Sequence, residues 1–483
     1  MQRDELSPDP GLPRGVSIAV AGFLAILWGI LAPVPFLSED WTQMEQLGRV
    51  PTFLGALDPA REPLRPLQHA FLWALAHCGV DPATWLPTAA RAFAFVLQGL
   101  ACWAVVGLAR RAGLGVRGVA IALLLFAVFP NVKMLSWPAA IGSPGRVAFE
   151  LLALLYLARR AGGGSARDGW IGLAALAVAL GFHESAFLLP AILLAWIACI
   201  GTESLASGMR RALAGLRDPF VLGACALGAF HLVHLLFFRP GRVHGAKDLA
   251  ALPANFVKAA LALAPEALRE IGVEGLRGNR GTVGIAAACI VLVVVAIVAL
   301  LALRRGGLAR FAVAAVAIDL GLAVAGAGFV QRYACLASAF AALALARLAN
   351  TGRRAAVATV ALLGLLWAGD SVQDALEIRA AGRSALALAA EARRVHDGGP
   401  LGIVGVPDMV GAEEDVPYFN WGGASFLRAH GVPAPVELLR ERRFRTNSDQ
   451  ELVDAARLRE LEAAGVDLWR WPALDSPLVS YPP

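Results

Sequence analysis

The stretch GIAAACIVLVVVAIVALLAL, residues 284–303, contains no charged side chain and is long enough for an α-helix to cross a bilayer. Residues 311–330 form a second such run, with Asp319 as its one ionisable group. Of the 483 residues, 58% are hydrophobic and 17% are charged, and the mean hydropathy is +0.62. Soluble proteins carry about 25% charged residues. The sequence therefore predicts an all-α polytopic membrane protein.

Pairs of arginines divide the apolar sequence and predict its topology. Cytoplasmic loops of membrane proteins are enriched in Lys and Arg, so an even number of spans should separate successive pairs. The pairs are Arg110-Arg111, Arg159-Arg160, Arg210-Arg211, Arg304-Arg305 and Arg353-Arg354. We predict two short spans within 118–158, two within 169–200, and single spans at 16–34, 84–109, 219–238, 283–303, 311–330, 334–349 and 355–369. This gives about eleven transmembrane helices, with the N-terminus inside and the C-terminus outside.

The distribution of charge agrees with this orientation. The proposed inside segments hold 16 Arg and 6 Asp or Glu, whereas the first outside loop holds 3 Arg and 6 Asp or Glu. The net charge of +6 could also indicate a nucleic-acid partner, but the arginines lie in short clusters between apolar runs. Because no basic stripe is interleaved with aromatic residues, we predict no nucleic-acid binding.

The predicted transmembrane domain, 1–369, has two large outer loops, and a domain outside the membrane follows it. The first loop, 35–83, contains an apolar segment at 64–79 that is too short to span and is typical of an interfacial helix. The second loop, 239–282, has helical character. The C-terminal domain, 370–483, is predicted to be a small α/β domain. We expect its amphipathic helix at 371–397, its buried strand at 401–406 and a turn at Pro407-Asp408.

Glu39 and Asp40 lie directly after the first predicted span, at the outer face. Two adjacent carboxylates at such a place could act as a general base, as ligands of a divalent metal ion, or as both. The alternative is a solvated acidic start of the loop, because surface charges often have no function.

Several cations are predicted at the same face. Lys133 and Arg146 flank a Pro- and Gly-rich break between two spans, and Arg65 lies in the first loop. Cations there could bind a phosphate whose lipid tail lies in the bilayer, or they could anchor the helices by snorkelling. The chain has only three lysines against 40 arginines, so Lys133 carries more information than any arginine.

Other polar groups interrupt or enter the apolar runs. His183-Glu184 lies within the run 169–200, where a hairpin tip explains both its polarity and its position. Arg332-Tyr333 lies between two late spans, again outside. Arg91 and Asp319 fall inside predicted spans, and we expect each to pair with another helix.

In chain order, these residues resemble the layout of a known group. The motifs are Glu39-Asp40, Arg65-Pro66-Leu67, Phe129 to Lys133 continuing through Trp137 to Gly145-Arg146, His183-Glu184 before Pro190, and Gln331-Arg332-Tyr333. The chain resembles integral membrane glycosyltransferases of the C-type fold, in particular protein O-mannosyltransferase-like and aminoarabinose-transferase-like proteins. The resemblance covers about residues 16–370.

The chain departs from the pattern of that group at three places. The usual Asp-Asp is Glu39-Asp40, which keeps the charge but lengthens one side chain. The usual Lys-Glu is His183-Glu184, which makes the charge there dependent on pH. The Arg-Tyr motif is followed by Ala334-Cys335 in place of a second aromatic residue.

The resemblance implies transfer of a sugar from a polyprenyl-phosphate donor, at the outer face of a bacterial inner membrane, to an acceptor glycan, lipid or protein. Asp40 would be the general base, with Glu39 helping it or binding a divalent metal ion. Donor phosphate would be bound by residues among Lys133, Arg146, Arg332 and Arg65, and His183, Glu184 and Tyr333 would complete the site. The alternatives are a transporter or flippase of lipid-linked saccharide, which would need a polar path across the bilayer, and a non-catalytic membrane assembly protein.

Overall fold

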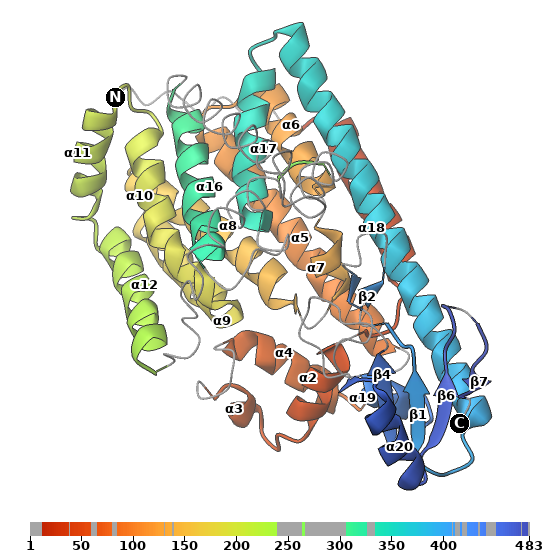
Figure 1. Cartoon of the computed structure of the whole chain (residues 1–483). Helices are drawn as coiled ribbons and strands as arrows, with labels where there is room; N and C mark the ends of the chain where they lie inside the picture. The colour runs from red at the N-terminus through yellow and green to blue at the C-terminus, as the bar shows by residue number, and fades with distance from the viewer. Residues whose placement is uncertain are drawn as a thin grey trace, which may run out of the picture. The chain divides into compact units, whose positions relative to one another are not determined.

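The structure is a computed structural model of the whole chain (Figure 1). It describes residues 12–37, 39–58, 65–79, 85–129, 131–137, 140–238, 263–265, 306–325, 334–407, 409–410, 416–417, 423–432, 435–440, 451–474 and 476–481. The predicted span 283–303, nearly all of the predicted loop 239–282, and Asp408 of the predicted turn lie outside these residues.

The chain forms two compact units, each assembled from three separate stretches. Unit 1 comprises Met1–Ala25, Val96–Asn131 and Ser143–Ser371. Unit 2 comprises Ile26–Phe95, Val132–Gly142 and Val372–Pro483. The segment 35–83, predicted to be the first outer loop, and the C-terminal residues 372–483 are far apart in the sequence and therefore come together in one unit.

Unit 1 consists of apolar helices. They are α6 (Val116–Val128), α8 (Gly142–Ala161), α9 (Ala166–Phe182), the 3₁₀ helix η2 (Glu184–Leu188), α10 (Leu189–Cys199), α11 (Leu205–Gly215), α12 (Pro219–Phe238), α16 (Gly307–Ala325) and α17 (Cys335–Ala349), together with parts of α1 (Arg14–Leu31), α5 (Trp85–Arg111) and α18 (Arg354–Val395). Every predicted span inside the described part of the chain coincides with a helix. The number of membrane crossings and their direction stay predictions.

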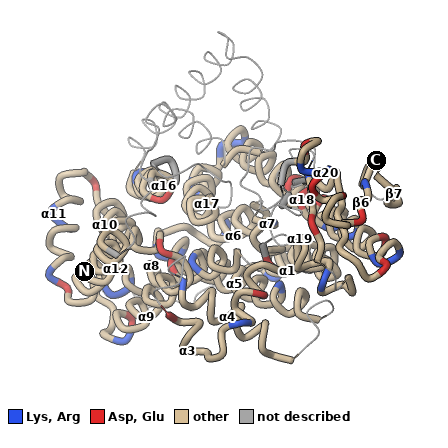
Figure 2. Tube along the Cα trace, turned by 60° about the horizontal axis from the view of Figure 1, so that its bottom comes forward, with Lys and Arg blue, Asp and Glu red and all other residues tan. Residues whose placement is uncertain are grey.

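Among the described residues, α1, α5, α12 and α18 are long and apolar enough to cross a membrane. The segments Val116–Val128, Glu184–Cys199 and Cys335–Ala349 are apolar but shorter. In the charge view, α6 and α17 are uncharged along most of their length, whereas charges gather on the elements of the C-terminal domain (Figure 2). This distribution is the one expected of helices surrounded by lipid and of a domain in water.

Two of the arginine pairs lie at the ends of helices, and a glycine with positive φ follows each of them. Gly113, at φ 75°, follows Arg110-Arg111, and Gly163, at φ 93°, follows Arg159-Arg160. After α5 the amide of Gly113 donates to the carbonyl of Arg110 at 2.9 Å and the next amide reaches back to Ala109 at 3.1 Å. This is the Schellman arrangement, which needs a left-handed residue and hence favours glycine.

The core of unit 1 is built on close helix contacts. α16 packs against α17 and α10, and α17 packs against α6. The ring of Phe311 lies edge-on to Trp196 and to Phe340, with centroids 4.9 and 5.3 Å away. A Cβ on Gly307 would lie 2.0 Å from the carbonyl oxygen of Cys199, so only glycine allows α16 to begin that close to α10. Small residues serve the same purpose in other membrane bundles.

In unit 2 the first outer loop folds as α2 (Glu39–Gly48), α3 (Phe53–Ala56) and α4 (Pro66–His77). α4 packs on both of the others, and Trp73 donates from its indole nitrogen to the carbonyl of Val50 at 2.8 Å. α4 occupies the segment predicted at 64–79, and its contact with a membrane stays a prediction. The short helix α7 (Val132–Ser136) also belongs to this unit.

The sequence predicted a span at 355–369 and a separate helix at 371–397, but α18 runs unbroken through both for 42 residues. It contains no proline, and its glycines weaken a helix by only about 1 kcal/mol each. Nothing in the sequence therefore ends the helix near the boundary predicted at residue 370. At 1.5 Å per residue α18 is about 63 Å long, roughly twice the hydrocarbon thickness of a bilayer.

The C-terminal domain is α/β, as predicted. Its sheet has the order β5 (Glu451–Leu452), β4 (Val436–Arg440), β1 (Leu401–Val404), β6 (Asp467–Arg470), β7 (Val479–Ser480). β1 is parallel to both neighbours, with Leu401 opposite Val436 and Asp467, and all four of its residues are buried, as is typical of a central parallel strand. The remaining described elements are the β2 (Met409–Val410) and β3 (Val416–Pro417) pair, α19 (Gly423–Ala429) and α20 (Ala455–Ala463).

Candidate functional site

Asp40 lies in the first turn of α2, where a carboxylate is favoured by the helix dipole. Its Oδ2 accepts a hydrogen bond from the amide of Leu37 at 3.2 Å, which joins the start of the helix to the preceding segment. The residue is 1% exposed. Glu39 lies beside it in α2, but its side chain is outside the described part of the structure. The predicted acidic pair thus starts a helix, and Asp40 is buried there.

Arg91, on α5, holds the segments around Asp40 together. Its guanidinium donates from Nε to the carbonyl of Ser136 at 2.9 Å and from Nη2 to that of Pro35 at 2.7 Å, and Nη1 donates to the carbonyl of Val34. The residue is 1% exposed, and the charge of Asp40 attracts it. The sequence did not identify the partners of Arg91; in the structure they are backbone carbonyls and Asp40.

Lys133 lies on α7, the helix that Arg91 contacts at Ser136. Its Nζ is 3.4 Å from Oδ1 of Asp374 on α18, and the lysine and aspartate side chains are 19% and 5% exposed. Arg65 is the residue before α4 and its carbonyl accepts from the amide of His69 at 3.0 Å. Asp40, Lys133 and Arg65 all belong to unit 2. Of these, Asp40 and Lys133 are linked through Arg91 and α7.

Arg146, predicted as a phosphate ligand, lies between two carboxylates in unit 1. Its Nε donates to Oε2 of Glu150 at 2.9 Å, and Nη2 donates to Oδ1 of Asp319. The other oxygen of Asp319 accepts from the amide of Ala337 at 3.1 Å. The side chain of Arg146 is 7% exposed, and those of the two acids are fully buried. This network joins α8, α16 and α17, and binding of phosphate by Arg146 stays a prediction.

Glu150 was not singled out by the sequence analysis. Its Oε1 has no hydrogen-bond partner among the described residues. The sequence nonetheless indicates this pair, because Arg146 and Glu150 are four residues apart and residues at that spacing meet on one face of a helix. The network therefore contains two acids and one guanidinium, all withdrawn from water.

His183 and Glu184 occupy the junction between α9 and η2. His183 ends α9, and its Nδ1 accepts from the amide of Ser185 at 3.2 Å and lies 2.7 Å from the Ser185 hydroxyl. Glu184 is 3.8 Å from the same ring nitrogen, with its side chain 25% exposed. These contacts account for the polar pair as part of a junction between two helices. A catalytic role for the pair stays a prediction.

The predicted site residues thus divide between the units: Arg146, His183 and Glu184 belong to unit 1. Arg332 and Tyr333 lie outside the described residues. Within the described ranges, no group of three or more His, Cys, Asp or Glu is arranged to hold a metal ion. Metal binding by Glu39 and Asp40 stays a prediction.

No protein-family model and no curated protein matches the sequence. Solved structures similar to the chain include ArnT from Cupriavidus metallidurans in the apo state, with a TM-score of 0.45, 13% identity, and coverage of 95% of this chain and 93% of that one. The Archaeoglobus fulgidus oligosaccharyltransferase tethered with an acceptor peptide has a TM-score of 0.42 and 14% identity. The same protein, AglB, in complex with an inhibitory peptide and a dolichol-phosphate has a TM-score of 0.42 and 12% identity.

The two oligosaccharyltransferase structures each match 86% of this chain, and the chain spans 64% of their length. ArnT and AglB are both glycosyltransferases of the C-type fold, the group that the motifs resemble. At these identities and TM-scores, the role of no individual residue carries over from them.

Proposed function

We propose that the chain is a membrane glycosyltransferase that moves a sugar from a polyprenyl-phosphate donor to an acceptor at the outer face of the membrane, with Asp40 as general base. The observation that carries the proposal is the burial of Asp40 in the first turn of α2, where the charge of Arg91 attracts it, in one unit with Lys133. Sugar transfer from a phosphate requires a carboxylate that takes up a proton and cations that stabilise the leaving phosphate.

In the proposed reaction Asp40 takes the proton of an acceptor hydroxyl as its oxygen attacks the anomeric carbon of the donor sugar. The bond from that carbon to the phosphate oxygen breaks, and the lipid phosphate leaves with the electron pair. Lys133 and Arg65, with Arg146 and Arg332 as further candidates, would stabilise the negative charge that develops on the phosphate. Attack from the side opposite the phosphate inverts the configuration of the sugar.

Arg91 is a positioning residue in this proposal. Its three hydrogen bonds to backbone carbonyls fasten α5 to the segment before α2 and to α7. Because Asp40 is 1% exposed, the acceptor reaches the carboxylate only when α2 shifts, and catalytic hydrogen bonds often form only once substrate is bound.

Lys133 would exchange its partner during binding. Its Nζ is 3.4 Å from Asp374, which keeps a cation at this place while the donor is absent. The donor is a phosphodiester with one negative charge and two non-bridging oxygens, and the lipid phosphate that leaves gains a second charge and a third terminal oxygen. Lys133 would therefore bind the developing leaving group more strongly than it binds the donor. A divalent ion bound by Glu39 and Asp40 would supply further positive charge at the phosphate.

Transport of a lipid-linked saccharide is the second candidate. The buried network of Arg146, Glu150 and Asp319 favours it, because ionisable groups in membrane spans often mark a transport path. The position of this network along α8, however, favours catalysis over transport. Arg146 and Glu150 lie about 6 and 12 Å along α8 from its first residue, which is the outer end in the predicted topology. A path across the membrane needs polar groups beyond that depth.

The test is sugar transfer by the full-length protein in nanodiscs from radiolabelled polyprenyl-phosphate sugars. We expect Asp40→Asn to insert and fold but to lose transfer by about 10²–10⁴-fold, the usual contribution of a general base. Asp58→Asn, an exposed aspartate of the same outer loop, is the matched control and should keep full activity. Unchanged transfer by Asp40→Asn would rule out the assigned base, and movement of intact donor across vesicle membranes without transfer would favour a flippase.

A further inference from the structure

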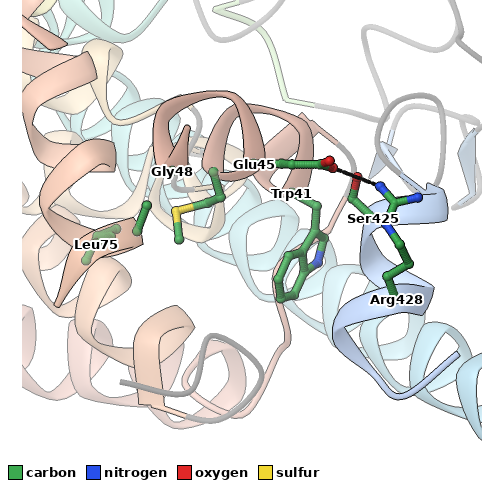
Figure 3. A pocket seen from close by; sticks show the side chains of 8 residues that line it. Trp41, Glu45, Gly48, Leu75, Ser425 and Arg428 are labelled. Carbon is green, nitrogen blue, oxygen red and sulfur yellow. Dashed lines mark hydrogen bonds and ion pairs between the residues drawn. The ribbon is translucent and has the colours of Figure 1, made fainter. Parts of the chain in front are cut away.

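A pocket in unit 2 lies where α2 and α4 of the first outer loop meet α19 of the C-terminal domain (Figure 3). Its volume is about 270 Å³. Pockets for small molecules begin at about 300 Å³. The pocket is slightly below that size, so it suits a single small ring and excludes an extended polymer.

One side of the pocket is polar. Oε2 of Glu45 accepts a hydrogen bond from Ser425 and another, at 2.9 Å, from Nη2 of Arg428, which also donates to the Ser425 hydroxyl at 3.0 Å. Figure 3 shows Glu45 pointing from α2 toward these two residues of α19. In the described residues every hydrogen bond of Arg428 leaves from Nη2. Nε and Nη1 are thus available as donors to a ligand.

The other side is apolar and rigid. Trp41, Met44 and Leu75 line it. The indole nitrogen of Trp41 donates to the carbonyl of Phe36 at 3.0 Å, and its ring lies edge-on to Phe426 with centroids 6.1 Å apart. The ring orientation is therefore set before any ligand arrives.

The charges of the lining select the class of ligand. Glu45 and Arg428 are the charged residues of the pocket, and they cancel. An anion would meet the carboxylate and a cation the guanidinium, so the pocket suits a neutral molecule. That molecule needs hydroxyls on one edge for Ser425 and Arg428, and an apolar face for the apolar side of the pocket. A pyranose ring has both, with hydroxyls around its rim and C–H groups on its face.

We infer that this pocket is the acceptor subsite of the enzyme and that it holds one neutral monosaccharide unit of the acceptor. The inference rests on the proposed transferase function and names its acceptor as a glycan. Trp41 directly follows Asp40 in α2, so the subsite and the proposed base share one helix.

The experiment is saturation-transfer NMR on the full-length protein in nanodiscs, with methyl α-D-mannoside, methyl β-D-glucoside and methyl β-D-galactoside as probes. We expect at least one to bind the wild type. Arg428→Met keeps the length of the side chain without its donors and should weaken binding about tenfold to a hundredfold, as expected for hydrogen bonds to a charged group. Arg459→Met, at an exposed arginine on α20, is the matched control and should bind as the wild type does.

A second variant blocks the pocket without touching the ion pair. A Cβ on Gly48 would meet nothing closer than the Ala76 Cβ at 3.9 Å, so Gly48→Leu fits on the backbone and occupies the pocket. We expect it to abolish glycoside binding.

Three results overturn the inference: no glycoside binds the wild type, both variants bind as the wild type does, or the neutral peptide N-acetyl-Gly-Ser-Gly-amide binds in place of the glycosides. If the wild type binds a glycoside but transfers no sugar, the proposed function is wrong and the sugar site stands. If it transfers sugar but binds no glycoside, the sugar site is wrong and the proposed function stands.

Discussion

Two arginine–carboxylate clusters in this protein use the same groups in different surroundings. In unit 1, Arg146 pairs with Glu150 and Asp319, and the acid side chains have no exposed surface. In unit 2, Arg428 pairs with Glu45, and their side chains are 41% and 34% exposed. Water can replace the partner in the second cluster but not in the first. The first cluster is therefore a structural requirement, and the second can change partners and so can serve binding.

Breaking the buried cluster should have the largest effect on stability. Arg146→Met leaves two carboxylates in an apolar interior, and removal of one partner of a buried ion pair costs about 3–5 kcal/mol. We expect a large drop in the thermal unfolding temperature of the protein in detergent.

The triple variant Arg146→Met, Glu150→Gln, Asp319→Asn is the control for this prediction, because it removes the stranded charges together with the arginine. We expect it to recover most of the lost stability. An Arg146→Met protein as stable as the wild type would mean that water or lipid headgroups reach the cluster.

Arg91 offers an intermediate case, because it is buried like Arg146 but bonded mainly to backbone. Arg91→Lys keeps the charge near Asp40 and cannot reach all three carbonyls at once. We expect a loss of about 1.5–3 kcal/mol, the contribution of one hydrogen bond to a charged group, since lysine must give up at least one of the three. Chemical denaturation of the detergent-solubilised protein measures this loss. If the variant lost sugar transfer but no stability, Arg91 would act on the reaction alone.

The exposed cluster should give the smallest effect, and one that depends on pH. The hydrogen bond from Ser425, with the charge of Arg428, lowers the pKa of Glu45 below its ordinary value of 4.5. A lowered pKa in the folded protein means that the contact contributes its full stabilisation above pH 4.5 and loses it as the pH falls further.

Glu45→Gln should therefore change the unfolding free energy by about 0–1 kcal/mol at pH 7, as for other exposed pairs. The difference from the wild type should disappear below pH 4.5 in a series of unfolding curves. A difference that grows on acidification would show that the assigned direction of the pKa shift is wrong.

Much of the helical framework could be predicted because its causes are local. The apolar runs, and the arginine pairs with a glycine after them, mark helices such as α5 and α8. β1 was predicted within 401–406 because an apolar run of that length, bounded by turn residues, suits a buried strand. The interruption predicted near residue 370 is absent, since no residue there is incompatible with a helix.

The candidate site was predictable in its residue types and only partly in its contacts. Asp40 and Lys133 were named from the sequence, because charges beside apolar runs stand out. Arg91 was named without a partner, and its partners turned out to be carbonyls, which every residue carries and no sequence pattern reveals. Glu45, Ser425 and Arg428 were not named, because the two ends of that contact are about 380 residues apart.

The sequence by itself determined that the chain forms apolar helices of membrane-spanning length, and it determined which charges interrupt them, because hydrophobic length and helix-ending residues act within a few turns. Only the tertiary structure decided that Arg146 pairs with Asp319, that Arg91 braces the segments around Asp40, and that α2 and α19 enclose a pocket. These outcomes depend on which buried groups find partners once the helices pack, and the cost of leaving a charge unpaired away from water is what selects them.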